Sequence, residues 1–433
     1  MANIYDIIYG AGVTLSAPLW LLKGKARRKV FSAFRNRMGH ADPRLGDAPL
    51  LLIHAVSLGE INATRKLLEE LSQARPDLYF VVTSTTETGF NRGLELYRHN
   101  PRVRVLRFPL DFSSGIRRLL DAVRPTIAVL MELEVWPNFM AQCHKRHIPV
   151  ILLNGRVTES SYRNYRRAAL VTRLMFSRLA AVCAQEELYA QRFIDMGVPA
   201  ERVKITGTMK FDTAQLAVAL AEADEMAGGL GLKPGERLWV CGSTGPGEEA
   251  ILLQLYSSLL RTHPDLRLAL IPRKPERFDE VAELIKAGGF ELLRRSDVRD
   301  GKAGVVSHHA VILGDTMGEL HKFYSLATVV FVGRTLVDLG KKQHGSDMIE
   351  PAALAKPVIV GPYTTNFAEV MNAFRQGAAI REIADSAELE QAVNALLGDA
   401  AAAGAIGSRA QEVVRQQQGA THRHVQAVLS LLK

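Results

Sequence analysis

The chain has 433 residues, of which 47% are hydrophobic and 23% are charged, and its formal net charge is +9. This length predicts two domains of about 200 residues each, and the ordinary composition excludes both wholesale disorder and a protein built of many membrane spans. The positive charge favours an anionic partner, and nucleic acid, phospholipid and a phosphorylated substrate would all satisfy it.

The first predicted element is an apolar segment followed by a basic cluster. Residues 7–22 carry no charge, and seven Lys and Arg side chains follow within residues 23–37. A bilayer span needs about 20 apolar residues, and Asp6 and Pro18 make this segment marginal as a span. It can cross the bilayer, insert obliquely or lie in the interface. The segment lacks the basic start and cleavage site of a signal peptide, and the basic residues after it place the main body in the cytoplasm. A buried amphipathic helix with a solvated basic face is a further alternative.

Two features bear on the compartment and the partner. The three cysteines, at positions 143, 183 and 241, lack the spacing of a metal site or a disulfide framework, which is typical of a reducing cytoplasm. The basic residues are not interleaved with stacking aromatic residues and form no recognisable nucleic-acid-binding motif. These features disfavour nucleic acid as the partner and favour a membrane surface with anionic lipid.

From residue 50 onward, short aliphatic runs alternate with helical patterns. The runs of the first half are LLLIHAV, YFVVTST, VRVLRF, IAVLME and PVILLN. The alternation lapses between residues 212 and 236 and restarts with LWVCGST, LRLALIP, AVILGD, VVFVG and PVIVG. Runs that are apolar on both faces predict parallel strands of doubly wound α/β sheets. The predicted parts are a membrane-associated segment, two Rossmann-like domains and a C-terminal helix, at residues 1–40, 41–215, 216–404 and 405–433.

The first chemical motif, HAVSLGE, follows the first strand and leads into a helix. Gly59 is expected to allow a tight turn, and Glu60 to project from the helix start towards a ligand, with Ser57 beside it. A carboxylate in this place can act as a general base on an incoming hydroxyl. Alternatively, Glu60 only complements the positive end of the helix.

Three more strands of the first half end in polar residues. Thr86, in the hydroxyl-rich loop TSTTETG, is either a ligand donor or a helix cap. The fourth strand is followed by MELEVWPN, where Glu132 and Glu134 should not both be buried without partners, so at least one is a candidate site residue. Arg156, in the NGR motif after the fifth strand, can pair with one of these acids or with a phosphate.

The domain boundary and the second domain add cations and a glycine-rich turn. Lys210 lies in GTMKFD, and Ser243 and Thr244 open the turn GSTGPGEE, whose backbone N–H groups can hold an anion. This turn is neither a Walker A loop nor a GxGxxG motif, which disfavours ATP and NAD. Arg273, in IPRKPERF, ends the next strand, where a guanidinium suits a carboxylate or a phosphate.

Three later turns complete the predicted ligand-binding site of the second domain. GDTMGEL is another glycine turn from strand to helix, and we assign Gly314, Met317 and Gly318 to the site. Glu350 begins the sequence EPAA just inside a helix that precedes a strand, and Asn366 lies in the polar loop after that strand.

In this order, the motifs HAVSLGE, TSTTETG, MELEVWPN, NGR, GTMKFD, IPRKPERF, GDTMGEL and EPAA resemble those of the 3-deoxy-D-manno-octulosonic acid (Kdo) transferases of Gram-negative bacteria, which act on lipid A precursors. The resemblance covers nearly the whole chain. It implies the α/β architecture called GT-B, in which two Rossmann-like domains face a cleft, together with an N-terminal membrane-associated helix.

The resemblance also implies an activity. The enzyme would transfer Kdo, with inversion, from CMP-Kdo to lipid IVA in lipopolysaccharide core biosynthesis, at the cytoplasmic face of the cell inner membrane. Glu60 matches the family's base, and one of the two acids after the fourth strand matches an acidic site residue. Lys210 and Arg273 match cationic contacts to the donor, and Glu350 matches the contact to its ribose. No cofactor and no metal are expected, because fixed cations and helix N-termini can stabilise the single phosphate of the leaving group.

One stretch departs from the family's pattern. Residues 340–347 read GKKQHGSD where the family has a Gly-Gly-His-Asn run, and Arg334 stands where a second small residue is common, which puts the donor contacts there in question. The alternatives are a GT-B transferase or epimerase that uses a UDP-sugar, and a membrane-bound scaffold that has lost catalysis. The retained Glu60, Arg273 and Glu350 oppose the scaffold.

Overall fold

The computed structural model describes residues 3, 5–7, 9–11, 14, 33–214, 216, 220–233, 235–301, 307–340 and 343–432. Most of the predicted apolar segment and basic cluster lies outside these residues. No helix within the described ranges is long and apolar enough to cross a membrane. The chain forms two compact units, one of Met1–Thr213 with Gln418–Lys433 and one of Ala214–Gln417.

The first unit is built on a parallel sheet. Among the described residues its strand order is β3-β2-β1-β4-β5-β6-β7, and all neighbours run parallel. The strands are β1 (Leu50–His54), β2 (Tyr79–Ser84), β3 (Val103–Arg107), β4 (Ile127–Met131), β5 (Val150–Gly155), β6 (Ala181–Ala184) and β7 (Val203–Ile205). The helices are α3 (Phe34–Arg37), α4 (Leu58–Ala74), α5 (Glu87–Tyr97), α6 (Ser113–Val123), α7 (Pro137–Lys145), α8 (Glu159–Arg167), α9 (Ala169–Phe176), α10 (Glu187–Asp195) and α20 (Ala420–Leu429), with 3-10 turns η1 (Ala200–Arg202) and η2 (Met209–Thr213).

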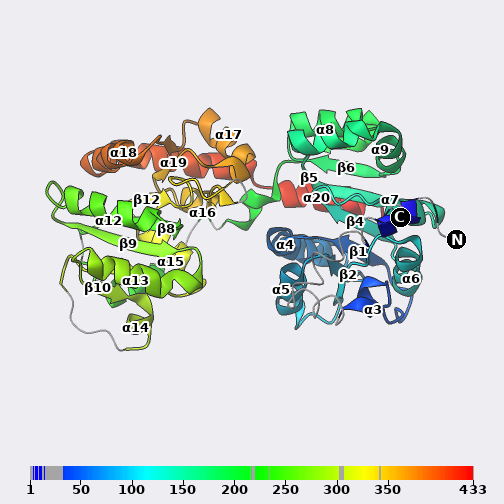
Figure 1. Ribbon diagram of the computed structural model, residues 1–433, viewed down its shortest axis with the longest axis horizontal. Helices are drawn as coiled ribbons and strands as arrows, with labels where there is room; N and C mark the ends of the chain where they lie inside the picture. Colours follow the sequence, from blue (N-terminus) through cyan, green and yellow to red (C-terminus); the bar gives the residue numbers. More distant parts are fainter. Residues whose placement is uncertain are drawn as a thin grey trace. The chain divides into compact units, whose positions relative to one another are not determined.

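Both faces of this sheet are buried, as expected for parallel strands with continuous apolar sequence. In β1, Leu50 and Leu52 pack with side chains of α6 and α7, whereas Leu51 and Ile53 pack with side chains of α4 and α20. This alternation follows from the two-residue period of a strand. Helices are seen on both sides of the sheet in Figure 1, where the last helix of the chain, α20, lies within the first unit.

The second unit repeats the plan. Among its described residues the order is β10-β11-β9-β8-β12-β13-β14, again with parallel neighbours. The strands are β8 (Arg237–Thr244), β9 (Leu266–Pro272), β10 (Leu292–Arg294), β11 (Val311–Leu313), β12 (Val329–Val332), β13 (Val358–Val360) and β14 (Arg381–Glu382). The helices are α11 (Leu220–Gly229), α12 (Glu248–Leu259), α13 (Phe278–Ala287), α14 (Arg295–Arg299), α15 (Leu320–Leu326), α16 (Ile349–Ala353), α17 (Ala368–Gln376), α18 (Ser386–Gly398) and α19 (Ala400–Gln417), with 3-10 turns η3 (Pro275–Arg277) and η5 (Thr365–Phe367).

The prediction of two doubly wound α/β domains is confirmed. Each aliphatic run quoted above overlaps one of the observed strands. The strands that were not predicted are short and lie near the sheet margins: β6, β7, β10 and β14. The predicted C-terminal segment contains the end of α19, then Gly419 at φ 90°, and α20.

The winding of each sheet reverses at one point. Successive strands proceed outward from β1 to β3 on one side, and the chain then returns to β4 on the other side of β1. In the second unit the corresponding neighbours are β8 and β12. Ligands of open α/β sheets bind beyond the carboxyl ends of the strands at such a reversal. The fold therefore marks one edge in each unit for a functional site.

The start of the chain packs against the first unit through a buried carboxylate. Asp6 accepts the N–H of Ser113 at 2.8 Å, the Ser113 hydroxyl at 2.5 Å and the side-chain amide of Asn138 at 2.8 Å. Ser113 begins α6, a helix whose own N-cap residue provides no side-chain cap. Burial opposes the charge of Asp6, but these hydrogen bonds prevail and lower its pKa.

Replacing Asp6 with alanine is expected to lower the free energy of unfolding by ~1–3 kcal/mol, because buried donors lose their acceptor. The pKa of Asp6 is lower in the folded chain than in the unfolded chain, so this stabilisation is present above about pH 4 and is lost as the pH falls through the folded-state value. Thermal unfolding at neutral pH measures the loss. Asp47→Ala, whose side chain is 95% exposed, is the control, and equal melting temperatures for the two variants would contradict the capping role.

Candidate active site

A capping box holds the Glu60 carboxylate at the carboxyl end of β1. Ser57 caps α4, and its hydroxyl accepts the N–H of Glu60 at 3.2 Å. In return, the two carboxylate oxygens of Glu60 accept the N–H groups of Ser57 at 3.0 Å and Val56 at 2.9 Å. Each oxygen keeps a further lone pair, so these bonds orient the carboxylate and leave it able to accept a proton. Glu60 is therefore a helix cap whose carboxylate is held in one orientation.

Two residues near Glu60, Gly59 and Thr86, were also predicted to belong to the site. The predicted tight turn at Gly59 is wrong, because Gly59 lies in the first turn of α4 and an added Cβ would meet only the Ser57 hydroxyl, at 3.9 Å. Thr86 is the N-cap of α5; its hydroxyl accepts the N–H of Gly89 at 3.1 Å and donates to the carbonyl of Val56 at 2.6 Å. Of the two interpretations of Thr86, the structure shows the helix cap. Thr86 also positions Val56, whose N–H binds Glu60.

One of the two acids after β4, Glu134, is affected by the charge of Glu60. Glu134 accepts the indole N–H of Trp136 at 3.0 Å. Burial raises the pKa of Glu134, the Trp136 hydrogen bond lowers it, and the charge of Glu60 raises it further. Burial and the charge of Glu134 likewise raise the pKa of Tyr165 on α8. Glu132 is half-buried at the end of the same strand. Trp136 and Tyr165 were not predicted, because their distance from Glu134 is set by packing.

The two predicted cations of the first unit lie beside a buried polar junction. Arg156 directly follows β5 and Lys210 lies in η2, and both are half-buried. Asn154 joins their segments, since its side-chain oxygen accepts the N–H of Met209 at 3.2 Å and its own N–H donates to His424 Nε2 at 2.9 Å.

Strained backbone marks the same edge of both sheets. Glu132 and Asn154 in the first unit have φ of 55° and 54°, and Ser243 and Arg334 in the second have φ of 57° and 61°. Side chains other than glycine rarely adopt this conformation, and such residues concentrate at functional sites. All four lie at or directly after the carboxyl ends of β4, β5, β8 and β12. Four other residues of the described chain with positive φ, Arg124, His147, Ala355 and Ala378, follow helices instead, so strain agrees with the strand ends as sites without singling them out.

In the second unit, Glu350 lies within a cluster of charges. Burial raises the pKa of Glu350 to about 7, the charge of Asp347 adds to this, and Arg273 opposes it. The pKa of Tyr324 is raised by burial and then by the charges of Glu350 and Asp347. An added Cβ at Gly242 would come within 2.1 Å of the Tyr324 hydroxyl, so only glycine fits there. Tyr324 comes from α15, and no pattern in the sequence linked it to EPAA.

A second guanidinium lies near Arg273. Arg334 follows β12, and its pKa is lowered by burial and by the positive charge of Arg273. Two guanidinium groups that repel one another are typical of an anion-binding site, because a phosphate or carboxylate between them relieves the repulsion. In the sequence, Arg334 stands out only as a departure from the family's pattern. Its position shortly after a central strand is the signal that makes it a candidate site residue.

The predicted anion-binding turn of GSTGPGEE is largely filled by a carboxylate of the protein. Glu248 is fully buried and accepts the N–H of Gly245 at 2.8 Å, together with those of residues 334–336 at 2.7, 2.9 and 2.9 Å. Of the backbone N–H groups that the turn is predicted to offer to an anion, that of Gly245 is therefore already occupied. Glu248 instead ties the turn after β8 to the loop that carries Arg334.

Replacing Glu248 with glutamine is expected to lower the free energy of unfolding by at least ~2 kcal/mol. An amide cannot accept four N–H groups and would turn its own donors towards some of them. Denaturant unfolding measures the effect, and Glu283→Gln, with a side chain 73% exposed, is the control. Equal transition midpoints would show that Glu248 does not hold this loop.

The other polar residues of this turn also have internal partners. Thr244 is buried and donates its hydroxyl to Glu249 at 2.8 Å, and Glu249 binds Arg277 through both oxygens at 2.6 and 3.1 Å. The carbonyl of Ser243 accepts the Ser346 hydroxyl at 3.3 Å. The side chain of Thr244 thus serves the fold.

The loop between β11 and α15 needs its two glycines. An added Cβ at Gly314 would come within 2.5 Å of Ile271, and Gly318 has φ of 83°. Met317, between them, is 73% exposed.

Asn366 is half-buried in η5. The neighbouring Thr365 lies 3.0 Å from Nδ1 of His344, whose Nε2 lies 2.8 Å from Asp338. These bonds connect η5 to the stretch that departs from the family's pattern, of which residues 341 and 342 lie outside the described part of the chain.

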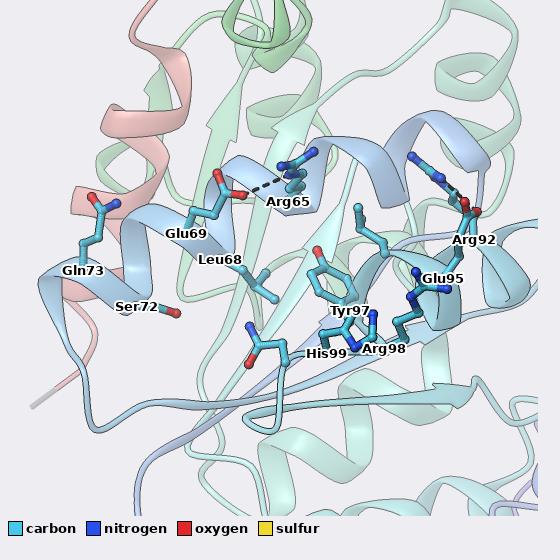
Figure 2. Close-up of a pocket in the computed structure, with 12 residues that line it drawn as sticks. Arg65, Leu68, Glu69, Ser72, Gln73, Arg92, Glu95, Tyr97, Arg98 and His99 are labelled. Carbon is cyan, nitrogen blue, oxygen red and sulfur yellow. Dashed lines mark hydrogen bonds and ion pairs between the residues drawn. The ribbon is translucent and has the colours of Figure 1, made fainter. Parts of the chain in front are cut away.

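A pocket of about 610 Å³ lies elsewhere, between α4, α5 and the loop after α5 (Figure 2). None of the predicted site residues lines it. Its cations lie beside acids of the same helix, with Arg65 paired to Glu69 at 3.0 Å and Arg92 to Glu95 at 2.9 Å. These pairs offset two of its cations, and Arg98 and His99 also line the pocket.

The two units offer different chemistry. The first presents the oriented carboxylate of Glu60 with a second acid, Glu134, in range. The second presents Arg273, whose charge acts on both Arg334 and Glu350, a set suited to an anion that also carries hydroxyls. In the described ranges, no group of three or more His, Cys, Asp or Glu is placed to hold a metal ion.

Comparisons with known proteins give a consistent result. Residues 32–213 match the family model described as 3-deoxy-D-manno-octulosonic-acid transferase (kdotransferase). A 3-deoxy-D-manno-octulosonic acid transferase of Haemophilus influenzae is 34% identical over 384 residues, covering 88% of this chain and 86% of that protein. One from Bordetella pertussis is 33% identical over 437 residues, covering 97% of this chain and 98% of that protein.

Solved structures resemble the fold. A UDP-GlcNAc 2-epimerase from Neisseria meningitidis, bound to UDP-GlcNAc, superposes with a TM-score of 0.58 at 13% identity, covering 88% of this chain and 100% of that one. Anabaena Alr3699/HepE in complex with UDP gives a TM-score of 0.57 at 14% identity, covering 88% of this chain and 99% of that one. At these identities the likeness shows the architecture, which is GT-B.

Proposed function

The chain belongs to the Kdo transferase family, and we propose that it transfers Kdo from CMP-Kdo to the lipid A precursor lipid IVA. It is a glycosyltransferase of lipopolysaccharide biosynthesis. The observation that carries the proposed donor is the pair Arg273 and Arg334 beside Glu350. CMP-Kdo carries a phosphate and a sugar carboxylate, which two guanidinium groups can bind, and a ribose whose hydroxyls can donate to a carboxylate.

In the proposed reaction, Glu60 removes the proton from the acceptor hydroxyl as that oxygen attacks the anomeric carbon of Kdo. The new carbon–oxygen bond forms on the face opposite to CMP, the bond between the anomeric carbon and the phosphate oxygen breaks, and CMP leaves with the electron pair. The proton ends on Glu60. The hydrogen bonds from Val56 and Ser57 support this role because they hold the carboxylate in one orientation.

The second unit is assigned to the donor. Arg273 and Arg334 stabilise the charge that develops on the departing phosphate, and Glu350 accepts the ribose hydroxyls. Lys210 is a further cationic contact to the donor in this proposal. Ser243, Asn366 and the β11–α15 glycine loop shape the same site, the first by its strained backbone and the last by its required glycines.

We place the enzyme at the cytoplasmic face of the inner membrane. The apolar segment 7–22 and the basic cluster after it support this location, since a lipid acceptor and an anionic surface suit both. The excess of basic residues would attract the phosphates of the acceptor.

The test is transfer from CMP-Kdo, generated in situ, to lipid IVA in detergent, followed by mass spectrometry. We expect a mass increase of one or more Kdo residues. CMP is expected to raise the melting temperature, whereas uridine diphosphate at the same concentration is not. No Kdo product, together with protection by uridine diphosphate and none by CMP, would favour a UDP-sugar enzyme. Protection by neither, with no product, would favour the scaffold.

A further inference from the structure

Helix α9 is apolar on two opposite faces. Thr172, Met175 and Phe176 are buried, and Phe176 belongs to the core of the first unit. On the outer face the apolar side chains are Leu170, Val171 and Leu174, which are 89%, 52% and 56% exposed. At 100° per residue these three side chains share one face of the helix, opposite the buried one. A surface helix of a soluble domain normally turns a polar face outward, so this outer face calls for an apolar partner.

The exposed apolar face is bordered by arginines. Arg166 and Arg167 end α8, Arg173 lies on α9, and all three are exposed. None of them forms an ion pair with a carboxylate in the part of the chain that the structure describes. The nearby acids have other partners: Glu159 pairs with Arg163 and Arg192, and Asp195 accepts the Tyr162 hydroxyl at 2.7 Å. The charge of Arg166 also lowers the pKa of Asp195, so Asp195 partly offsets Arg166, whereas Arg167 and Arg173 keep the border positive.

This surface adjoins the candidate active site within the same unit. Tyr165 of α8 is half-buried, packs edge-on against the Phe176 ring, and has its pKa raised by burial and by the charge of Glu134. Glu134 in turn lies in the range of Glu60. A groove of about 480 Å³ runs along α8 and α9, lined by Tyr162, Tyr165, Arg166 and Arg173 among others. The apolar face and its basic border therefore belong to the same unit as Glu60 and Glu134.

We propose that the α8–α9 surface docks directly on an anionic lipid bilayer: Leu170, Val171 and Leu174 enter the headgroup boundary, and Arg166, Arg167 and Arg173 contact lipid phosphates. The charge complementarity selects anionic lipid over an uncharged apolar partner. This contact is separate from the predicted N-terminal segment. It brings the edge that carries Glu60 to the membrane surface, where a lipid acceptor presents its hydroxyl, and only this last consequence depends on the proposed function.

A reporter on the outer face tests the docking. The three native cysteines are buried, so a polarity-sensitive dye will react selectively with the thiol of Leu174→Cys in the full chain. We expect its emission to shift to the blue on vesicles containing phosphatidylglycerol, and to shift much less on vesicles of phosphatidylcholine alone. The matched control is Leu94→Cys, on the outer face of α5, where the leucine is 45% exposed and no shift is expected.

The outcomes separate the possible occupants. No shift at Leu174→Cys while the protein floats with the vesicles would overturn the proposal and leave the contact to the N-terminal segment. A shift without vesicles that grows with protein concentration would assign the face to a second copy of the chain, and one independent of concentration would assign it to another segment of the same chain. Either result rejects lipid docking. These vesicles contain no acceptor, so the result does not depend on whether Kdo transfer occurs.

An affinity measurement provides a second readout. The double variant Leu170→Ser with Leu174→Ser is expected to bind anionic vesicles roughly tenfold more weakly or worse, because the apolar surface that enters the bilayer is lost. Leu94→Ser should bind like the unchanged protein. Equal vesicle affinity for the double variant and the unchanged protein would reject the proposal.

Discussion

Replacing Glu60 with glutamine is expected to lower kcat for Kdo transfer by roughly 10²- to 10⁴-fold, the usual contribution of a general base. Glutamine keeps the size of the side chain and still serves in a capping box, because its carbonyl oxygen accepts one of the two N–H groups that the carboxylate holds. It cannot take a proton from the acceptor hydroxyl. KM for CMP-Kdo should change little, since Glu60 is assigned no contact to the donor.

The measurement is initial-rate kinetics with both substrates varied, together with the melting temperature of the variant. Glu69→Gln, an exposed position on the same helix, is the control and should keep full activity. A Glu60→Gln enzyme that is folded and nearly fully active would remove Glu60 as the base. Glu134 would then be the next candidate, because burial and the charge of Glu60 raise its pKa.

Replacing Glu350 with glutamine is expected to raise the free energy of unfolding and to weaken the binding of CMP. Burial and the charge of Asp347 raise the pKa of Glu350 to about 7, well above its ordinary value near 4.5. Ionising this carboxyl in the folded chain therefore lowers the free energy of unfolding. This loss is absent below about pH 4.5 and is complete above about pH 7. Glutamine removes it, so the variant should be more stable than the unchanged protein by roughly 2–3 kcal/mol at pH 8 and equally stable at pH 4.5.

The functional effect has the opposite sign. If Glu350 accepts the ribose hydroxyls as an ion, Glu350→Gln should weaken CMP binding about tenfold or more at pH 8, because charge-assisted hydrogen bonds are lost. Melting curves at the two pH values and calorimetric titration with CMP measure both effects. Glu225→Gln, at an exposed position of α11, should change neither. Unchanged CMP affinity would remove Glu350 from the donor site, even if the stability gain were observed.

Part of the site could be predicted because it is local in the chain. Motifs that directly follow aliphatic runs were expected at strand ends, and Ser57, Glu60, Thr86 and Glu134 do lie at that edge of the first sheet. Helix caps are also local, since they join residues three positions apart, which is why the cap was one of the two interpretations of Thr86.

The errors arose where distant residues compete for the same groups. The turn GSTGPGEE has the composition of an anion-binding loop, but Glu248 reaches the N–H groups of residues 334–336, about 90 positions away in the chain, as well as that of Gly245. The prediction of a tight turn at Gly59 was wrong for a different reason. Glycine can adopt conformations that other residues rarely adopt, but Gly59 has the ordinary helical conformation of α4.

By itself, the sequence determined the two parallel α/β units, the order of the motifs and hence the family, because aliphatic periodicity and short motifs are properties of contiguous residues. Only the tertiary structure decided which charges meet. In the folded chain, Asp347 and Tyr324 interact electrostatically with Glu350, and Arg334 interacts with Arg273. Asp6 binds the start of α6. Leu170, Val171 and Leu174 face outward. The physical reason is that burial and electrostatic interaction depend on distance in space, which the folding of the whole chain sets.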